Sequence, residues 1–232
     1  MTVTVIGAGI TGVTTAYYLA KSGYDVLVVD EKRYPGMGTS YANGGQLSAS
    51  NAEVWNSWHN VGKGIKWMFR KDAPLKINPK PSLHKYSWFT RFLANIPNRV
   101  DNTLKTCEMA IEAHNLYKNI ADQEGIDFDC VKQGILHIYS DHADLHHARE
   151  TNKIYTAAGL SRREICREEA FGIEPALSNS RRNVIGGFYT EEDFTGDIHK
   201  FCVNLGRHIE KKYAVKFVQE IVDSESLDLF QK

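Results

Sequence analysis

The sequence predicts an α/β fold that opens with a Rossmann-like βαβ unit, and three features near the N-terminus predict it. The β-branched run at residues 3–6 is typical of a short buried parallel strand. The glycine pattern GAGITG follows at residues 7–12 and leads into a stretch with helical spacing of apolar side chains. A second apolar run at residues 26–29 ends at Asp30, so the order strand, glycine turn, helix, strand and acid is complete.

Each glycine of this turn has a separate physical role. Gly7 allows the tight turn out of the strand, and Gly9 has no Cβ, so a pyrophosphate can approach the backbone. Gly12 allows the helix to pack closely on the strand. The helix N-terminus adds N–H groups and a partial positive charge. The candidate phosphate-binding residues are therefore Gly7, Ala8, Gly9, Ile10, Thr11 and Gly12.

Asp30 stands at the end of the second predicted strand, where a carboxylate accepts hydrogen bonds from an adenosine ribose. The same negative charge repels a 2′-phosphate, which disfavours NADP. The motif by itself does not separate FAD from NAD, and a glycine-rich structural turn is the simpler alternative.

A polar loop rich in small residues follows, GTSYANGGQ at residues 38–46, where a plain NAD domain would continue into another apolar helix. Its hydroxyl and amide groups are able to bond phosphates and the heteroatoms of a ring. An ordinary surface loop has the same composition.

Composition narrows the class of protein. The chain has 232 residues with 28 basic and 28 acidic side chains, which argues against a nucleic-acid binder driven by overall charge. Its four cysteines are far apart in sequence and form no CxxC pair, a pattern that favours reduced thiols over disulfides or zinc. No apolar run approaches the roughly 20 residues of a membrane span, and the N-terminus has no basic lead-in, so we expect a soluble, cytoplasmic protein without a signal peptide.

The segment 55–99 is strongly basic, although the whole chain has equal numbers of basic and acidic side chains. It holds nine Lys and Arg residues and a single acid, Asp72, interleaved with tryptophans and phenylalanines. Such a segment fits a peripheral contact with an anionic membrane surface. It also fits single-stranded nucleic-acid stacking, and it fits a domain whose aromatics are core and whose lysines are solvated. We favour the domain with core aromatics and solvated lysines, place membrane contact second and nucleic-acid stacking last, and expect no nucleic-acid partner.

Further along the chain, apolar spacing predicts a helix from Asp101, capped by Asp101 or Asn102, to Gly125. Residues 126–139 read as strand, 198–212 as a helix and 215–218 as a strand that returns to the first sheet. His142 and His146 lie one helical turn apart, but no third ligand is evident, so we predict no metal site. The arginines at 162, 163, 167, 181 and 182 alternate with glutamates and are predicted to be solvated and ion-paired.

Three stretches resemble one family closely: residues 7–30, TSYANGGQ at 39–46, and GIKWMFRKDAPLKI at 64–77. Together they are similar to the small subunit of bacterial D-amino acid dehydrogenases, within the D-amino-acid-oxidase-like FAD-dependent oxidoreductases. The resemblance runs to about residue 218 and fits only the N-terminal half of such enzymes. It implies a Rossmann-like FAD-binding domain with an inserted α+β cap (substrate) domain, incomplete in this chain.

The resemblance also implies domain limits and roles. Residues 1–50 would form the FAD-binding βαβ unit and flavin loop, 51–187 part of the cap domain, and 188–232 a truncated return to the FAD-binding domain. Asp30, with Glu31, would hold the adenosine ribose of FAD. The residues along the flavin side would be Thr39, Ser40, Asn43, Gly44 and Gln46. His137 and Tyr139 would face the substrate, and no catalytic residue is assigned.

The implied reaction is oxidative deamination of a D-amino acid to a 2-oxo acid and ammonia, with hydride transfer to flavin and a quinone-type electron acceptor. Membrane contact through residues 55–99, at the inner face of the cell membrane, would suit that acceptor. Two alternatives stay open: a truncated, non-catalytic dinucleotide-binding fragment that needs a partner chain to complete the fold, and an NAD-linked dehydrogenase.

Overall fold

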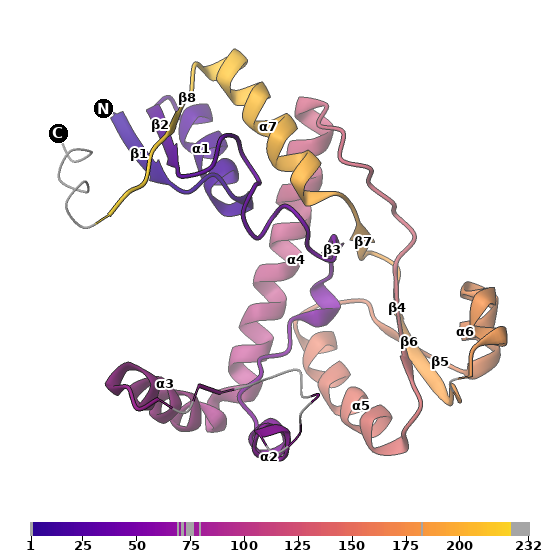
Figure 1. The fold of residues 1–232 in the computed structure, drawn as a ribbon. Helices are drawn as coiled ribbons and strands as arrows, with labels where there is room; N and C mark the ends of the chain where they lie inside the picture. The colour runs from indigo at the N-terminus through magenta and orange to yellow at the C-terminus, as the bar shows by residue number, and fades with distance from the viewer. Residues whose placement is uncertain are drawn as a thin grey trace. The chain divides into compact units, whose positions relative to one another are not determined.

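The computed structural model describes residues 2–68, 70, 72, 77–78, 80–181 and 183–223 (Figure 1). Phe69, Lys71, Lys76 and Arg182 therefore lie outside the described residues, as do parts of the 64–77 motif and the tail after residue 223. The chain divides into two compact units. Unit 1 comprises Met1–Leu47, His114–Gly134 and Glu191–Lys232, and unit 2 comprises Ser48–Ala113 and Ile135–Thr190.

Unit 1 is built on a parallel three-stranded sheet. Its strands are β1 (Thr2–Ile6), β2 (Asp25–Asp30) and β8 (Lys216–Gln219), in the order β1-β2-β8. Helix α1 (Ile10–Lys21) makes the crossover between β1 and β2. The strand predicted at 215–218 does return to this sheet, where Gln219 is the register partner of Asp30. The α/β fold class is confirmed.

Helices α1 and α7 (Ile198–Tyr213) both pack into the core of unit 1. Helix α1 buries Val13, Ala16 and Tyr17, and it ends before Gly23, whose φ of +87° suits glycine. Helix α7 begins at Asp197, whose carboxylate accepts a hydrogen bond from the Lys200 N–H. Its apolar side then packs into the same core as α1. The short strands β3 (Gln46–Leu47) and β7 (Phe194–Thr195) pair antiparallel in this unit.

One carboxylate ties three segments of unit 1 together. The Glu124 side chain, at the end of α4 (Arg99–Glu124), is only 4% exposed and lies 2.5 Å from the Lys212 ammonium and 2.7 Å from the His208 ring. It also accepts a hydrogen bond of 2.9 Å from the Tyr17 hydroxyl. The hydrogen bond from Lys212 is the main reason that the pKa of Glu124 falls to about 2. Glu124 therefore links α1, α4 and α7.

Unit 2 contains an antiparallel sheet with helices around it. The strands are β4 (Ile135–Tyr139), β5 (Arg163–Ile165) and β6 (Gly186–Thr190), in the order β4-β6-β5. Helix α5 (His142–Ala157) starts at Asp141, whose carboxylate accepts from the N–H groups of Ala143 and Asp144. Unit 2 also contains the first part of α4, up to Ala113, and the elements η1 (Ala49–Asn51), α2 (Trp58–Met68), α3 (Leu83–Ala94), η2 (Ile96–Asn98), α6 (Arg167–Ile173) and η3 (Pro175–Asn179).

Three expectations from the sequence are wrong in detail. The long helix begins at Arg99, so Asp101 lies in its first turn and does not cap it. Only residues 135–139 of the predicted strand 126–139 form a strand, because Asp129 adopts a left-handed backbone (φ +54°) that interrupts an extended run. Arg162 is not solvated: it is 7% exposed, and its guanidinium lies over the Phe188 ring at 4.3 Å.

The Glu124 contacts predict an acid-sensitive unit 1. The pKa of Glu124 is lowered on folding, so its stabilising contribution is complete above its unfolded-state pKa of 4.5 and is lost as the pH falls toward about 2. Since Lys212 is half exposed, we expect Glu124→Gln to lower the free energy of unfolding by about 1–2 kcal/mol at neutral pH. Chemical denaturation of the wild type and the variant measures this change in the free energy of unfolding. The exposed Glu112→Gln on the same helix is the control, and equal effects of the two variants would contradict the assignment.

Candidate functional site

The glycine turn between β1 and α1 is held by close backbone contacts. Gly7 has a φ of +98°, and its N–H donates to the Val29 carbonyl oxygen at 2.7 Å, which fixes the end of β1 beside β2. A Cβ on Gly12 would lie 1.8 Å from the Gly7 carbonyl oxygen, far inside contact distance. Gly12 is therefore required for the helix to approach the strand.

Gly9, in contrast, has space around it. It is the N-cap residue of α1, with extended backbone, and a Cβ built there would meet only the Ser40 hydroxyl, at 3.5 Å. The Ile10 N–H donates to that hydroxyl at 3.1 Å, so the loop after β2 is tied to the first turn of α1. Thr11 is exposed in the same turn. The N-terminus of α1 thus presents an open backbone surface beside Ser40.

Asp30 is turned toward the glycine turn. Its Oδ2 accepts from the Ala8 N–H at 2.6 Å, and its Oδ1 accepts from the Lys32 N–H at 2.7 Å. Each carboxylate oxygen has a second lone pair available for a ligand hydroxyl. Glu31 is exposed and forms an ion pair with Lys32 at 2.9 Å.

A cavity of about 530 Å³ opens beside Asp30 within unit 1. Helix α7 and strand β8 form part of its wall, and its charged lining includes three bases and two acids. The polar residues that line it are Asp30, Lys32, Arg33, Tyr34, His199, Arg207, Glu210 and Gln219. The volume is within the range of small-molecule sites.

The loop after β2 is mostly exposed. Ser40 is buried, whereas Thr39, Asn43, Gly44 and Gln46 are exposed along residues 39–46. The Asn43 side-chain oxygen accepts from the Gly45 N–H at 2.8 Å. Gly45 itself has a φ of +59°, and a Cβ there would lie 2.6 Å from the Gly196 carbonyl oxygen, so the loop is anchored beside β7.

The structure brings together some of the predicted site residues and adds others. Ala8 and Asp30 line the cavity, and Ser40 lies at the helix N-terminus. The cavity lining also includes Lys32, Arg33, Arg207 and Gln219, which belong to no motif in the sequence. Only the first two carry a sequence signal, their position directly after Asp30. Arg207, on α7, and Gln219, on β8, are about 180 residues further on, and they reach the cavity through the packing of α7 into the core of unit 1 and the pairing of β8 with β2.

Cys202, on α7, is a buried thiol near this loop. Burial raises the pKa of its thiol to about 11, so the thiolate is scarce at neutral pH. All four cysteines are free thiols. Within the described ranges, no group of three or more His, Cys, Asp and Glu side chains is arranged to hold a metal ion.

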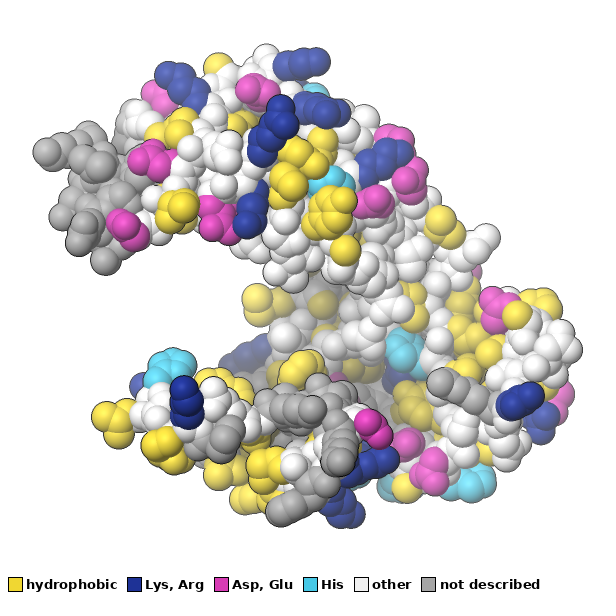
Figure 2. Space-filling model, viewed as in Figure 1, with side chains coloured by type: hydrophobic (Ala, Val, Ile, Leu, Met, Phe, Trp, Pro, Cys, Tyr) yellow, Lys and Arg dark blue, Asp and Glu magenta, His cyan; other side chains and the backbone are white. Residues whose placement is uncertain are grey.

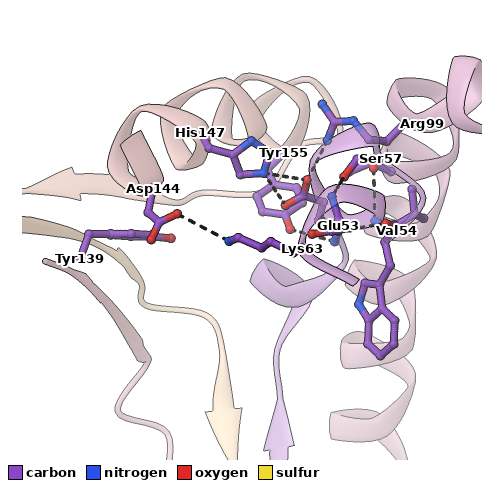
Figure 3. Close-up of polar contacts among 12 residues, drawn as sticks. Glu53, Val54, Ser57, Lys63, Arg99, Tyr139, Asp144, His147 and Tyr155 are labelled. Carbon is purple, nitrogen blue, oxygen red and sulfur yellow. Dashed lines mark hydrogen bonds and ion pairs between the residues drawn. The ribbon is translucent and has the colours of Figure 1, made fainter. Parts of the chain in front are cut away.

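Unit 2 has its own polar network, centred on Glu53 (Figure 3). The Glu53 carboxylate accepts from Arg99 at 2.7 Å and lies 3.0 Å from the His147 ring nitrogen, while its backbone N–H donates to the Tyr155 hydroxyl at 2.9 Å. Burial raises the pKa of Tyr155 to about 12, so this phenol stays protonated. The network joins the segment after η1 to α4 and α5.

The two residues expected to face a substrate make contacts inside unit 2. The Tyr139 hydroxyl accepts from the Arg162 guanidinium at 3.3 Å, and the ring packs edge-on against Phe188 at 6.3 Å. The His137 Nε2 lies 3.0 Å from the Asn51 side-chain oxygen. Neither contact assigns either residue a catalytic role.

The parallel sheet, the glycine turn and the cavity beside Asp30 define a dinucleotide-binding α/β protein. The family match identifies the dinucleotide: residues 2–226 match the family described as FAD dependent oxidoreductase. The chain therefore belongs to the FAD-dependent oxidoreductase family.

Among curated relatives, the chain is 54% identical over 212 residues to D-amino acid dehydrogenase 3 of Mesorhizobium japonicum, an alignment that covers 91% of this chain and 51% of the relative. It is 38% identical over 210 residues to D-amino acid dehydrogenase of Dechloromonas aromatica, covering 90% and 50%. The chain is thus a D-amino acid dehydrogenase homologue that spans about half the length of these relatives, as the sequence analysis expected.

Solved structures share the fold at low sequence identity. L-proline dehydrogenase from P. horikoshii superposes with a TM-score of 0.63 at 19% identity, covering 93% of this chain and 43% of that one. Glycine oxidase from Geobacillus kaustophilus gives 0.62 at 16% identity, covering 95% and 47%.

The residues present fit the dinucleotide end of FAD. The space around Gly9 is a backbone cradle that a larger side chain would fill, and it lies at a helix N-terminus. Asp30 and the basic side chains beside it suit a ribose and its phosphates.

Gly9 and Gly12 form a matched pair for testing this assignment. We expect Gly9→Ala to fold normally but to bind FAD at least about tenfold more weakly, because the added methyl group occupies the approach to the backbone. Gly12→Ala should lower the melting temperature with or without FAD, since its Cβ overlaps the Gly7 carbonyl. Flavin fluorescence titration and thermal unfolding separate the two effects. Unchanged flavin affinity in Gly9→Ala would place the phosphates elsewhere.

Proposed function

We propose that this chain forms the FAD-binding half, together with part of the substrate domain, of an enzyme that oxidatively deaminates D-amino acids. The glycine turn beside Asp30 carries the proposal, because it combines an open helix N-terminus with a ribose-binding carboxylate. Identity of 54% to a D-amino acid dehydrogenase supports the substrate class.

In the proposed reaction, the substrate loses its α-hydrogen as hydride and a proton from its amino group. Water then hydrolyses the resulting imine to a 2-oxo acid and ammonia. FAD, when bound, supplies the two-electron redox chemistry that no amino-acid side chain offers. The electrons then pass to a quinone-type acceptor.

In this proposal, the residues of unit 1 bind and orient the cofactor. The turn at residues 7–12 holds the diphosphate through backbone N–H groups and the partial charge of α1. Asp30 holds the adenosine ribose, and Glu31 contributes charge near it. Ser40 fixes the loop to α1, and the loop residues Thr39, Asn43, Gly44 and Gln46 lie along the flavin side. The cap domain, which we assign to residues 51–187, takes part in substrate binding.

Because the relatives are about twice as long, we propose that catalysis requires the rest of the family fold, supplied by a partner chain or by a longer polypeptide. A dinucleotide-binding chain without catalysis of its own is the second candidate. An NAD-linked dehydrogenase is the third, and Asp30 is compatible with its ribose.

The purified chain distinguishes these functions. We expect it to bind FAD with a yellow colour, and the flavin absorbance to bleach anaerobically with D-alanine once the missing half of a D-amino acid dehydrogenase is added. L-alanine is the matched control. Flavin binding without bleaching supports the binding module. A chain that is colourless and is stabilised thermally by NAD but not by FAD contradicts the flavoenzyme.

We further propose a peripheral contact between unit 2 and the inner face of the cell membrane, in the cytoplasmic compartment where the four thiols stay reduced. Helix α2 has no buried residue in the structure, and Trp58, at 68% exposure, lies on it with Lys63 and Lys66. Aromatic side chains beside lysines are typical of membrane-surface helices. In the described part of the chain, no helix has both the length and the hydropathy to cross a bilayer.

Vesicle sedimentation tests this contact. We expect the chain to bind vesicles made of equal amounts of phosphatidylglycerol and phosphatidylcholine at low salt, and to be released as salt screens the lysines. Pure phosphatidylcholine vesicles are the control. Equal binding to both kinds of vesicle, or none to either, would remove the proposal.

A further inference from the structure

Helix α3 exposes an apolar surface that unit 2 does not use for its core. None of its residues is buried, Leu83 is 91% exposed, and Trp88 is about half exposed. Trp55, just before α2, is 81% exposed. Figure 2 shows hydrophobic and basic side chains next to one another over this helix. Such an exposed apolar area is typical of an interaction site.

Two open hollows share a pair of α3 side chains, Trp88 and Arg91, in their linings. The first, of about 290 Å³, is lined by Trp55, Asn56, Trp88, Arg91, Phe92 and Asn95. The second, of about 370 Å³, is lined by Leu83, His84, Ser87, Trp88 and Arg91. Arg91 is thus the one permanent charge common to two mainly apolar hollows.

The first hollow is a fixed feature of unit 2. Asn56 is buried, and its amide donates to the Asn95 carbonyl oxygen at 2.7 Å, which joins the segment after Trp55 to the end of α3. Trp88 and Phe92 stack with ring centroids 5.1 Å apart and form an apolar wall.

The charge around the hollows selects for an anion. Residues 77–98, which include all of α3, contain no Asp or Glu. No ion pair involves Arg91 in the part of the chain that the structure describes. Lys85 adds a second positive charge on the same helix and donates to the Asn78 carbonyl oxygen. A guanidinium of this kind is well suited to a phosphate.

We propose that this surface binds one anionic phospholipid of the bilayer, with its phosphate on Arg91 and one acyl chain in each hollow. Two apolar hollows that share one guanidinium match the arrangement of two chains attached to one phosphate. The proposal rests on the membrane contact proposed above and names the lipid site within it. Trp88 separates the two chains, and Trp55 covers the first.

The test compares Arg91→Gln with Lys66→Gln on α2, which removes an equal charge outside both hollows. Binding of the full chain to vesicles of equal phosphatidylglycerol and phosphatidylcholine is measured by sedimentation. We expect Arg91→Gln to weaken it about 10- to 100-fold, as for a charge-assisted phosphate contact. Lys66→Gln should weaken it only about fivefold, the effect of one diffuse surface charge. Thermal unfolding checks that both variants fold.

A second measurement uses dihexanoyl-phosphatidylglycerol below its micelle concentration. We expect saturable quenching or shift of tryptophan fluorescence in the wild type and in Lys66→Gln, and its loss in Arg91→Gln. Equal weakening of vesicle binding by both variants, with no saturable binding of the short lipid, overturns the lipid site but leaves the membrane contact intact. Absence of vesicle binding by the wild type overturns both. Dimerisation lost in Arg91→Gln would show that a second copy covers α3, which also overturns the lipid site.

Discussion

The contact on which unit 1 depends is the approach of α1 to the end of β1, where Gly12 lies against the Gly7 carbonyl. No side chain fits between them, because even a Cβ would lie 1.8 Å from that oxygen. This contact sets where the N-terminus of α1 points, and thereby where Ile10 meets Ser40 and where Ala8 meets Asp30. The geometry of the proposed diphosphate site is therefore a result of backbone packing and of missing side chains, with few polar groups of its own.

In both units polar contacts join distant segments, but unit 2 also has two helices with no buried side chain. In unit 1, buried polar contacts join distant segments: Glu124 joins three helices, and Ser40 joins a loop to α1. In unit 2, the Glu53 network joins the segment after η1 to α4 and α5, while no side chain of α2 or α3 is buried. The exposed aromatic side chains Trp58, on α2, and Trp88, on α3, thus lie outside this network.

Where the sequence carried strong local patterns, the fold followed them. The first βαβ unit has its strands and helix where apolar spacing and glycine positions predict them, and α7 begins at its Asp197 cap. The predicted strand at 126–139 failed over its first part because a left-handed residue, Asp129, has no distinctive signal in one sequence. The burial of Arg162 was also unpredictable, since it depends on aromatic rings from α5 and β6. Gln219 reaches the cavity by long-range strand pairing and Arg207 by the packing of α7, and local patterns encode neither contact.

The segmented make-up of unit 1 has a consequence for synthesis on the ribosome. Strand β8 pairs with β2 across almost 190 residues, and Lys212 reaches Glu124 from the same late part of the chain. Unit 2, whose segments end at residue 190, is translated in full before α7 emerges. Domains generally fold as units, so unit 2 can fold first. The β1-α1-β2 segment then lacks its contacts with β8 and α7 until the end of the chain is made. During that interval, chaperones could bind the exposed apolar side chains of the N-terminal β1-α1-β2 segment.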